Sequence, residues 1–296
     1  MKKRICFAGH GELVERLIEA TSRDFAIVAV ILTERMGANN IARMSSFCHE
    51  RSIPTQVGFE GAQADAFLTP NFPLLLPAEF AENHLCVNVH YALLPKYRGF
   101  HPVQCALIND EPIVGYSVHR VDGGVDSGPI FFQEQLGVTD ADSVHTLNAR
   151  MTNHLVANFP RYLKEIFDGK QPAPQDESDA IYCGKRHPED GLIDWGESSR
   201  AIFNLVRAVC PPYYPGAYTF WKERKIIITA AEEQQTARYR HIAGQVVDVR
   251  MGRGLLVKTG DTLLWLKRVQ IDEVEGSAET LIGRRIGLRF QSQPTP

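Results

Sequence analysis

Short apolar runs alternate with amphipathic stretches over residues 1–168 of the chain. The run AIVAVIL at residues 26–32 is apolar throughout and rich in β-branched residues, which is typical of a strand buried on both faces of a sheet. Before it, Leu13, Leu17 and Ile18 lie near helical spacing. Strands that alternate with helices pair in parallel, because the helix carries the chain back across the sheet. We predict an α/β fold with a Rossmann-like, mostly parallel sheet for residues 1–168.

The pattern changes after the polar, proline-bearing stretch GKQPAPQDESDA, which predicts a linker at residues 169–190. Beyond it, short β-rich segments punctuated by glycine dominate, among them GAYTFWK, KIIITAAE, GQVVDVR and TLLWLKRVQ. Segments of this length and spacing favour a small β-barrel. We therefore predict an OB-like barrel domain at residues 191–296.

Charge and composition narrow the class of protein. The formal net charge is −3, and the chain carries no block of basic residues beyond KKR near its start, so a nucleic-acid partner is not expected. No apolar run reaches the length of a membrane span, and no signal-peptide pattern is present. The six cysteines have no CxxC spacing, which predicts reduced thiols in the cytoplasm and no metal site.

Two polar residues interrupt the apolar strand LCVNVH at residues 85–90. Asn88 and His90 are two residues apart and therefore point to the same face of the strand. The loop VDGGVDSG at residues 121–128 would present Asp126 at the same sheet edge. An amide, an imidazole and a carboxylate can together act on an acyl group. From the residues alone, a buried histidine with satisfied hydrogen bonds and a turn aspartate remain the alternative.

The stretch NVHYALLPKYRG together with GVDSG resembles the core signature of the 10-formyltetrahydrofolate-dependent formyltransferases. That family includes methionyl-tRNA formyltransferase, glycinamide ribonucleotide transformylase and the sugar-nucleotide N-formyltransferases. The segments RHPEDGLIDW and NLVRAVCPPYYPGAYTF are similar to the junction and barrel of the formyltransferase half of the aminoarabinose-pathway enzyme. The resemblance implies an enzyme that takes its formyl group from 10-formyltetrahydrofolate and uses no metal.

The resemblance also implies roles for individual residues. It makes Asn88, His90 and Asp126 the catalytic trio: Asn88 and protonated His90 would hold an oxyanion, and Asp126 would keep His90 charged and help remove the amine proton. For the folate it implies an apolar wall and a loop, made by Phe72, Leu74, Leu75, Leu76, Pro77, Asp122 and Gly124. Core packing is the alternative for Leu74 and Leu76.

The sequence indicates the acceptor amine less clearly than it indicates the formyl donor. The tRNA enzymes carry an extended basic loop after the second strand, whereas TERMGANNIARMSS here is short, with Arg35 and Arg43 as its only bases. We therefore expect a nucleotide-linked amino sugar, and leave open methionyl-tRNA, an amino-acid or peptide precursor, a catalytically silent folate- or nucleotide-binding module, and a homodimeric state. The residues expected to meet this substrate are Tyr91, Lys96, Arg98 and Arg207, with Tyr91 adding bulk beside the trio where relatives carry a smaller residue.

Overall fold

The computed structural model describes residues 1–212, 214–234, 236 and 239–293. It divides into two compact units. The first comprises residues 1–102, 113–137 and 148–184, and the second comprises residues 103–112, 138–147 and 185–296. Much of the expected linker thus belongs to the first unit, and two short segments of the expected catalytic domain belong to the second.

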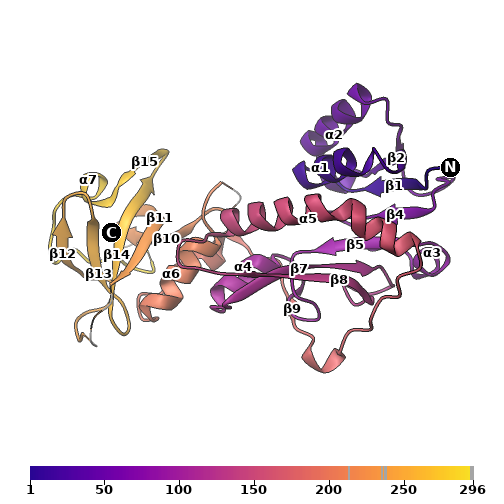
Figure 1. The fold of residues 1–296 in the computed structure, drawn as a ribbon. Helices are drawn as coiled ribbons and strands as arrows, with labels where there is room; N and C mark the ends of the chain where they lie inside the picture. The colour runs from indigo at the N-terminus through magenta and orange to yellow at the C-terminus, as the bar shows by residue number, and fades with distance from the viewer. Residues whose placement is uncertain (213, 235, 237–238, 294–296) are drawn as a thin grey trace. The chain divides into compact units, whose positions relative to one another are not determined.

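The first unit is built on a seven-stranded sheet, which confirms the predicted α/β fold. Five strands are parallel, and the last two pair antiparallel at one edge. In Figure 1 these strands lie side by side in the right-hand part of the picture. In sheet order they are β3 (Thr55–Val57), β2 (Ala26–Leu32), β1 (Arg4–Ala8), β4 (Ala66–Leu68), β5 (Cys86–His90), β7 (Ile113–Arg120) and β8 (Ile130–Gly137).

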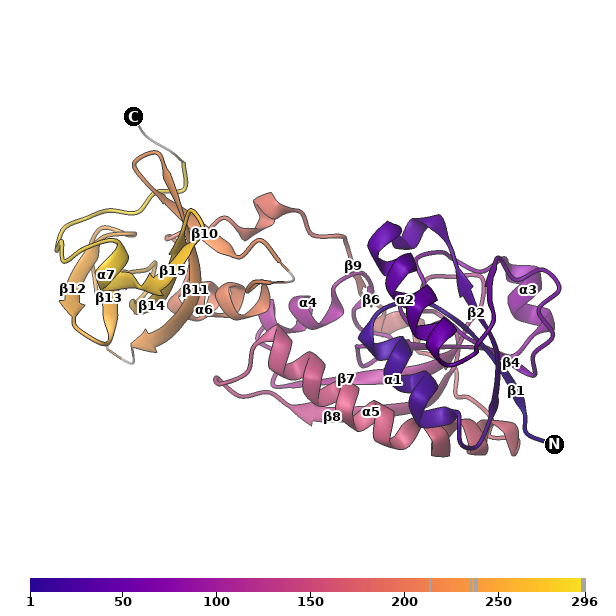
Figure 2. The same ribbon diagram turned by 90° about the horizontal axis from the view of Figure 1, so that it is seen from above.

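Helices pack against this sheet as the apolar spacing predicts. The first two helices lie side by side (Figures 1 and 2), and Arg43 of the second makes an ion pair with Glu15 of the first at 2.7 Å. The fifth helix packs on the antiparallel edge, where Tyr162 stacks on Phe132 of β8. The helices are α1 (Glu12–Thr21), α2 (Ala38–Glu50), α3 (Ala78–Asn83), α4 (Pro102–Ile108) and α5 (Val144–Phe167).

Short elements fill the connections. A two-stranded ribbon pairs β6 (Arg98–Gly99) with β9 (Tyr182–Cys183), and the 3-10 turns are η1 (Glu34–Met36), η2 (Glu177–Asp179) and η3 (Pro188–Gly191). The turn after β1 is close-packed: a Cβ at Gly9 would overlap the carbonyl oxygen of Pro70, which follows β4. This contact explains the first glycine of GHGELV as a packing requirement.

The second unit contains a six-stranded antiparallel sheet, which confirms a separate, smaller β domain at the C-terminal end. Residues 287–291 bond to Gly244 and Val246 next to one edge strand and to Phe220 in the other, so they close the sheet into a barrel. Trp265 is fully buried inside it. The elements are α6 (Ser199–Ala208), β10 (Ala217–Trp221), β11 (Arg224–Gln234), β12 (Val246–Arg250), β13 (Gly254–Lys258), β14 (Leu263–Ile271), β15 (Val274–Ser277) and α7 (Ala278–Leu281).

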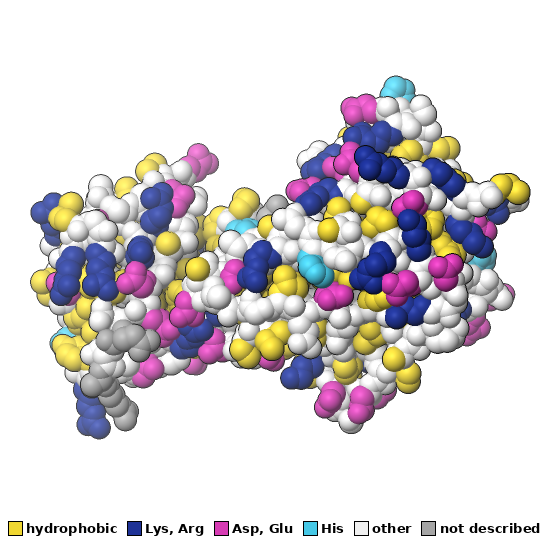
Figure 3. Space-filling view, viewed as in Figure 1, with side chains coloured by type: hydrophobic (Ala, Val, Ile, Leu, Met, Phe, Trp, Pro, Cys, Tyr) yellow, Lys and Arg dark blue, Asp and Glu magenta, His cyan; other side chains and the backbone are white. Residues whose placement is uncertain are grey.

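The surface carries charges of both signs. On the face drawn in Figure 3, lysine and arginine side chains are interspersed with aspartate and glutamate. Among the described residues, no helix is both long and apolar enough to cross a membrane.

Candidate active site

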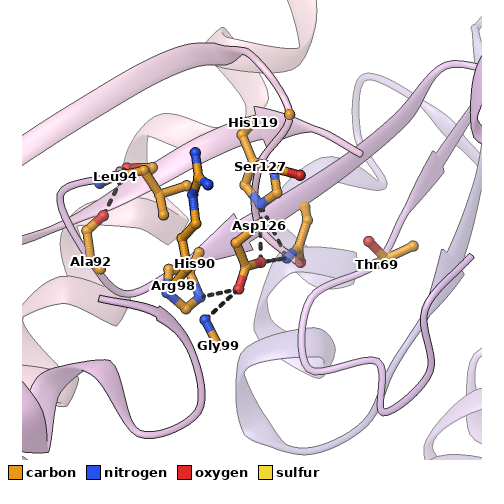
Figure 4. Close-up of polar contacts among 12 residues, drawn as sticks. Thr69, His90, Ala92, Leu94, Arg98, Gly99, His119, Asp126 and Ser127 are labelled. Carbon is orange, nitrogen blue, oxygen red and sulfur yellow. Dashed lines mark hydrogen bonds and ion pairs between the residues drawn. The ribbon is translucent and has the colours of Figure 1, made fainter. Parts of the chain in front are cut away.

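Three elements of the first unit bring polar side chains to one place. Asn88 and His90 lie on β5, which pairs antiparallel with β7 so that Asn88 is opposite His119. The loop that follows β7 turns back and carries Asp126 toward β5 (Figure 4). This loop is tight: a Cβ at Gly128 would overlap the carbonyl oxygen of Arg120.

Asp126 is the centre of the cluster. Its Oδ2 accepts the backbone N–H of Gly99 at 2.9 Å and lies 3.4 Å from His90 Nδ1. Its Oδ1 lies 3.4 Å from His119 Nε2 and accepts from Asn88 Nδ2 at 3.3 Å. Burial by itself would raise the pKa of Asp126, but the hydrogen bond from His119 and the two imidazoles lower it to about 2. The carboxylate is therefore ionised at neutral pH.

His90 is buried between two acceptors. Its Nε2 lies 2.7 Å from the carbonyl oxygen of Tyr97, and its Nδ1 faces Asp126. Burial lowers the pKa of His90 below its usual value, and the charge of Asp126 and the hydrogen bond to the Tyr97 carbonyl offset part of that fall. A neutral imidazole has one N–H, so contacts with acceptors on both sides are satisfied only by the protonated ring.

The amide of Asn88 faces into the cluster. Its Nδ2 is 3.2 Å from His119 Nε2 as well as 3.3 Å from Asp126 Oδ1. Its Oδ1 is buried and has no hydrogen-bond partner among the residues that the structure describes. A buried acceptor without a partner is costly, and it is satisfied when a ligand brings an N–H group. Asn88 thus has a free acceptor among the described residues, whereas the resemblance implies a role as a donor.

His119 is a fourth member of the cluster that sequence reasoning missed. It is buried, and its Nδ1 is 2.9 Å from the carbonyl oxygen of Arg120. That contact fixes the proton on Nδ1 and leaves Nε2 to accept from Asn88 when the ring is neutral. The signal in the sequence is a polar residue in the apolar strand IVGYSVHR. Only the antiparallel pairing with β5 shows that this residue reaches Asn88.

Changing His119 provides a first test of the cluster. The variant His119→Phe is expected to lower kcat for formyl transfer about tenfold, because the polar contacts of His119 Nε2 with Asp126 and Asn88 are lost. His119→Gln retains a polar end of similar reach and is expected to lose less activity. Steady-state kinetics of the two variants make the comparison, and equal rates in both would contradict a polar role for His119.

The segment at residues 72–77 divides between core and surface. Leu76 is buried in a cluster with Phe67, and Phe72 packs against that cluster. Leu74 and Leu75 are exposed, by 44% and 63%. The segment borders the loop at residues 121–128, which we call the catalytic loop. A Cβ at Gly123 would be 3.0 Å from that of Ala78, which directly follows Pro77. Leu76 therefore serves the core, and a contact of the exposed apolar wall with folate stays a prediction.

Asp122 and Gly124 shape the catalytic loop. Asp122 accepts the backbone N–H of Gly124 at 2.9 Å and the hydroxyl of Ser127 at 2.8 Å. A Cβ at Gly124 would overlap the Ser127 hydroxyl. Both residues hold the turn that places Asp126, and a contact with folate stays a prediction for each.

The four residues expected to meet the acceptor lie in different places. The Tyr91 hydroxyl is 2.7 Å from Thr152 Oγ1, which ties the end of β5 to α5. Lys96 is exposed in the turn after β5. Arg98 is fully buried and bonds to Gln175 and Glu177. Arg207 belongs to the second unit, where it bonds to Asn204 and to the carbonyl of Thr139.

Within the described part of the chain, no group of three or more His, Cys, Asp and Glu side chains is arranged to hold a metal ion. The cysteines are free thiols, and burial raises the pKa of Cys6 and of Cys86 to about 12.

Comparisons with known proteins identify relatives of both parts of the chain. The formyl transferase family matches residues 45–163, and the formyl transferase C-terminal domain matches residues 185–281. The methionyl-tRNA formyltransferase of Thermodesulfovibrio yellowstonii is 32% identical over 241 residues, which cover 74% of this chain and 72% of that protein. The methionyl-tRNA formyltransferase of Dictyoglomus turgidum is 33% identical, covering 70% of this chain and 67% of that protein.

Solved structures share the fold at lower identity. An N-formyltransferase from Helicobacter canadensis, in complex with folinic acid and dTDP-3-aminofucose, superposes with a TM-score of 0.67. It is 17% identical in sequence, and the match covers 90% of this chain and 99% of that one. At this identity the likeness establishes the fold.

Proposed function

The chain belongs to the family of 10-formyltetrahydrofolate-dependent formyltransferases, and on that premise we propose that it formylates the primary amine of a nucleotide-linked amino sugar. The observation that carries the formyl-transfer centre is the contact of Asp126 with both His90 and Asn88. An ionised carboxylate in contact with an imidazole, beside an amide oxygen that has no partner among the described residues, suits the attack of an amine on an acyl carbon.

We assign the steps as follows. Asn88 Oδ1 accepts a hydrogen bond from the incoming amine and orients its lone pair toward the formyl carbon. His90 transfers the hydrogen bond of its Nε2–H group from the Tyr97 carbonyl to the developing oxyanion. Asp126 stays ionised, and its charge favours the protonated form of His90 against the effect of burial. When 10-formyltetrahydrofolate is bound, it supplies the formyl carbon, and its N10 takes up the proton that the amine releases as the N10–C bond breaks.

We place the folate-binding surface on the same side of the site. Phe72, Leu74 and Leu75 form apolar surface next to the catalytic loop, and two of them are exposed. A pterin ring bound there would bury this surface. Its formyl-bearing nitrogen would then be directed toward the loop that carries Asp126.

The distribution of charged residues favours a small-molecule acceptor over tRNA. The connection between β2 and α2 consists of Thr33, the single turn η1 and Gly37, so it holds no extended basic loop. Arg43 of α2 is neutralised by two bonds of 2.7 Å to the carboxylate of Glu15. Basic and acidic side chains alternate over the face in Figure 3. Affinity for nucleic acid comes mainly from contacts with phosphates, which a chain with a net charge of −3 is poorly equipped to make.

Methionyl-tRNA is the second candidate acceptor, and the sequence comparisons favour it. The two methionyl-tRNA formyltransferases are 32% and 33% identical to this chain and match most of its length. The charge argument and the sequence comparisons thus support different acceptors, so the assay has to include both.

An acceptor panel separates the candidates. Purified protein with 10-formyltetrahydrofolate is offered dTDP- and UDP-linked amino sugars, free amino acids and methionyl-tRNA, and amide formation is measured. We expect turnover with an amino sugar that changes little between low and moderate salt. Turnover with methionyl-tRNA alone, falling steeply as salt rises, would contradict the proposed acceptor and support tRNA.

A further inference from the structure

Residues 173–183 are hydrogen-bonded to other segments of the first unit. Ala173 forms a β-bridge with Ile130 of β8. Farther on, the backbone N–H of Arg98 donates to the carbonyl of Ile181 at 2.8 Å, and that of Phe100 donates to Cys183 at 3.1 Å. We call residues 173–183 the strap. Backbone hydrogen bonds hold both ends of the strap next to the catalytic loop.

Gln175 of the strap contacts the catalytic loop directly. Its side-chain Nε2 donates to two backbone carbonyls, those of Asp126 and Gly128, each at 2.7 Å. Its Oε1 accepts from Arg98 Nη2 at 2.8 Å and from Arg98 Nε at 3.1 Å. All the hydrogen-bonding capacity of this amide is thus used between the catalytic loop and one buried arginine.

Arg98 anchors Gln175 in turn. The guanidinium of Arg98 is fully buried and makes a two-point ion pair with Glu177, at 2.7 and 2.9 Å, and a bond of 2.9 Å to the Tyr182 hydroxyl. Its planar fork presents fixed donors to Gln175 and Glu177 together. Because Glu177 and Tyr182 are also strap residues, Arg98 holds the strap in one position.

The catalytic aspartate is held from both of its ends. The backbone of Asp126 has a φ of 52°, a left-handed conformation that costs energy for most residues other than glycine. Its carbonyl is held by Gln175, and its carboxylate by the N–H of Gly99, the residue next to Arg98. Gln175 and Arg98 therefore complete a ring of contacts around the residue that faces His90.

We propose that Gln175 is a positioning residue for formyl transfer: it fixes the backbone carbonyl of Asp126 so that the carboxylate meets His90. The proposal rests on the proposed function, because it assigns Asp126 to that reaction. It gives the strap a part in catalysis, which the composition of the segment does not suggest.

Two substitutions test the proposal. Gln175→Ala removes the contact, and Gln175→Glu places a carboxylate against two carbonyl oxygens. We expect kcat to fall about tenfold in the first and further in the second, with the KM for the folate unchanged within about twofold. Gln171→Ala is the matched control, because Gln171 is exposed on the same connection and, among the described residues, its amide bonds to Gly169 alone.

A pH profile distinguishes positioning from a merely structural role. Asp126 and His119 are the titratable groups that face His90. If Asp126 moves away, the protonated form of His90 is less stable, and activity is lost at a lower pH on the alkaline side. A Gln175→Ala enzyme with wild-type kcat would overturn the proposal. So would one whose kcat and melting temperature both fall while the alkaline limb stays in place.

The positioning role of Gln175 can be tested even if the protein shows no formyl transfer to the acceptors offered. If the wild-type protein formylates no amine in the panel, the proposed function fails, and the positioning role is then read by NMR titration of His90 in the full chain. A lower pKa of His90 in Gln175→Ala than in wild type and Gln171→Ala supports the contact with Asp126. Identical titration curves in all three proteins would overturn it.

Discussion

His90→Asn is expected to reduce formyl transfer about a thousandfold while folate affinity stays within about twofold of the wild type. The asparagine is smaller, so it introduces no steric clash, but it carries no charge and has no imidazole N–H group to donate to the oxyanion. The side chain it replaces contacts the Tyr97 carbonyl and Asp126, and no contact places it on the apolar wall at residues 72–77. Single-turnover rates and the quenching of protein fluorescence by folate measure the two properties separately.

A second histidine controls for the substitution itself. His49 is exposed on α2, and His49→Asn is expected to have wild-type rates. If His90→Asn retained more than about a tenth of the wild-type rate, His90 would not be the main hydrogen-bond donor to the oxyanion. Loss of folate binding in the same variant would instead place His90 in the donor site.

Asp126→Asn is expected to lower kcat at least a hundredfold and to shift the alkaline limb of the pH profile to lower pH. The carboxylate lies 3.4 Å from His90 and supplies the charge that favours the protonated ring, so removing the charge lowers the pKa of His90. The backbone should tolerate the change, because asparagine adopts a φ near 52° more readily than most residues.

The same variant has a predicted signature in stability. The pKa of Asp126 is lowered to about 2 in the folded protein, so its carboxylate stabilises the fold above the usual pKa near 4 and loses that contribution as pH falls toward 2. The contribution is about 2 kcal/mol, and Asp126→Asn lacks it. The difference in unfolding free energy between the two proteins should therefore shrink as pH is lowered from 5 to 2.

Asp272→Asn is the matched control for both measurements. Asp272 also has a left-handed backbone, with a φ of 55°, but its side chain is 85% exposed in the turn before β15. A pH profile and an acid-unfolding curve like those of the wild type are expected. If Asp126→Asn behaved in the same way, the carboxylate of Asp126 would have no electrostatic role in the site.

Local patterns sufficed for much of the fold. The run AIVAVIL forms β2, because a continuous apolar run suits a strand buried on both faces. Leu13 and Leu17 lie on the buried face of α1, because helical spacing places apolar residues on one side of a helix. The short elements β3 and α3 were missed, since three and six residues carry little periodic signal. The antiparallel pairing of β7 with β5 depends on contacts distant in sequence, which no local pattern records.

The candidate site shows the same division. Asn88 and His90 could be placed on one face of a strand from their spacing alone, and the Gly-rich loop indicated Asp126. His119 and Gln175 could not be found this way, because each acts across a pairing or a fold-back that the sequence does not specify. The hydroxyl of Tyr91 bonds to Thr152 of α5, and a contact of Tyr91 with the substrate stays a prediction.

The most direct measurement follows an isotopically labelled formyl group from 10-formyltetrahydrofolate into the acceptor panel, by mass spectrometry, in the wild type and in Asn88→Ala, His90→Asn and Asp126→Asn. Our account predicts labelled amide on a nucleotide-linked amino sugar with the wild-type protein and at most traces with the three variants. Labelled amide formed at wild-type rates by any of the three would contradict the assignment of the catalytic centre to these residues.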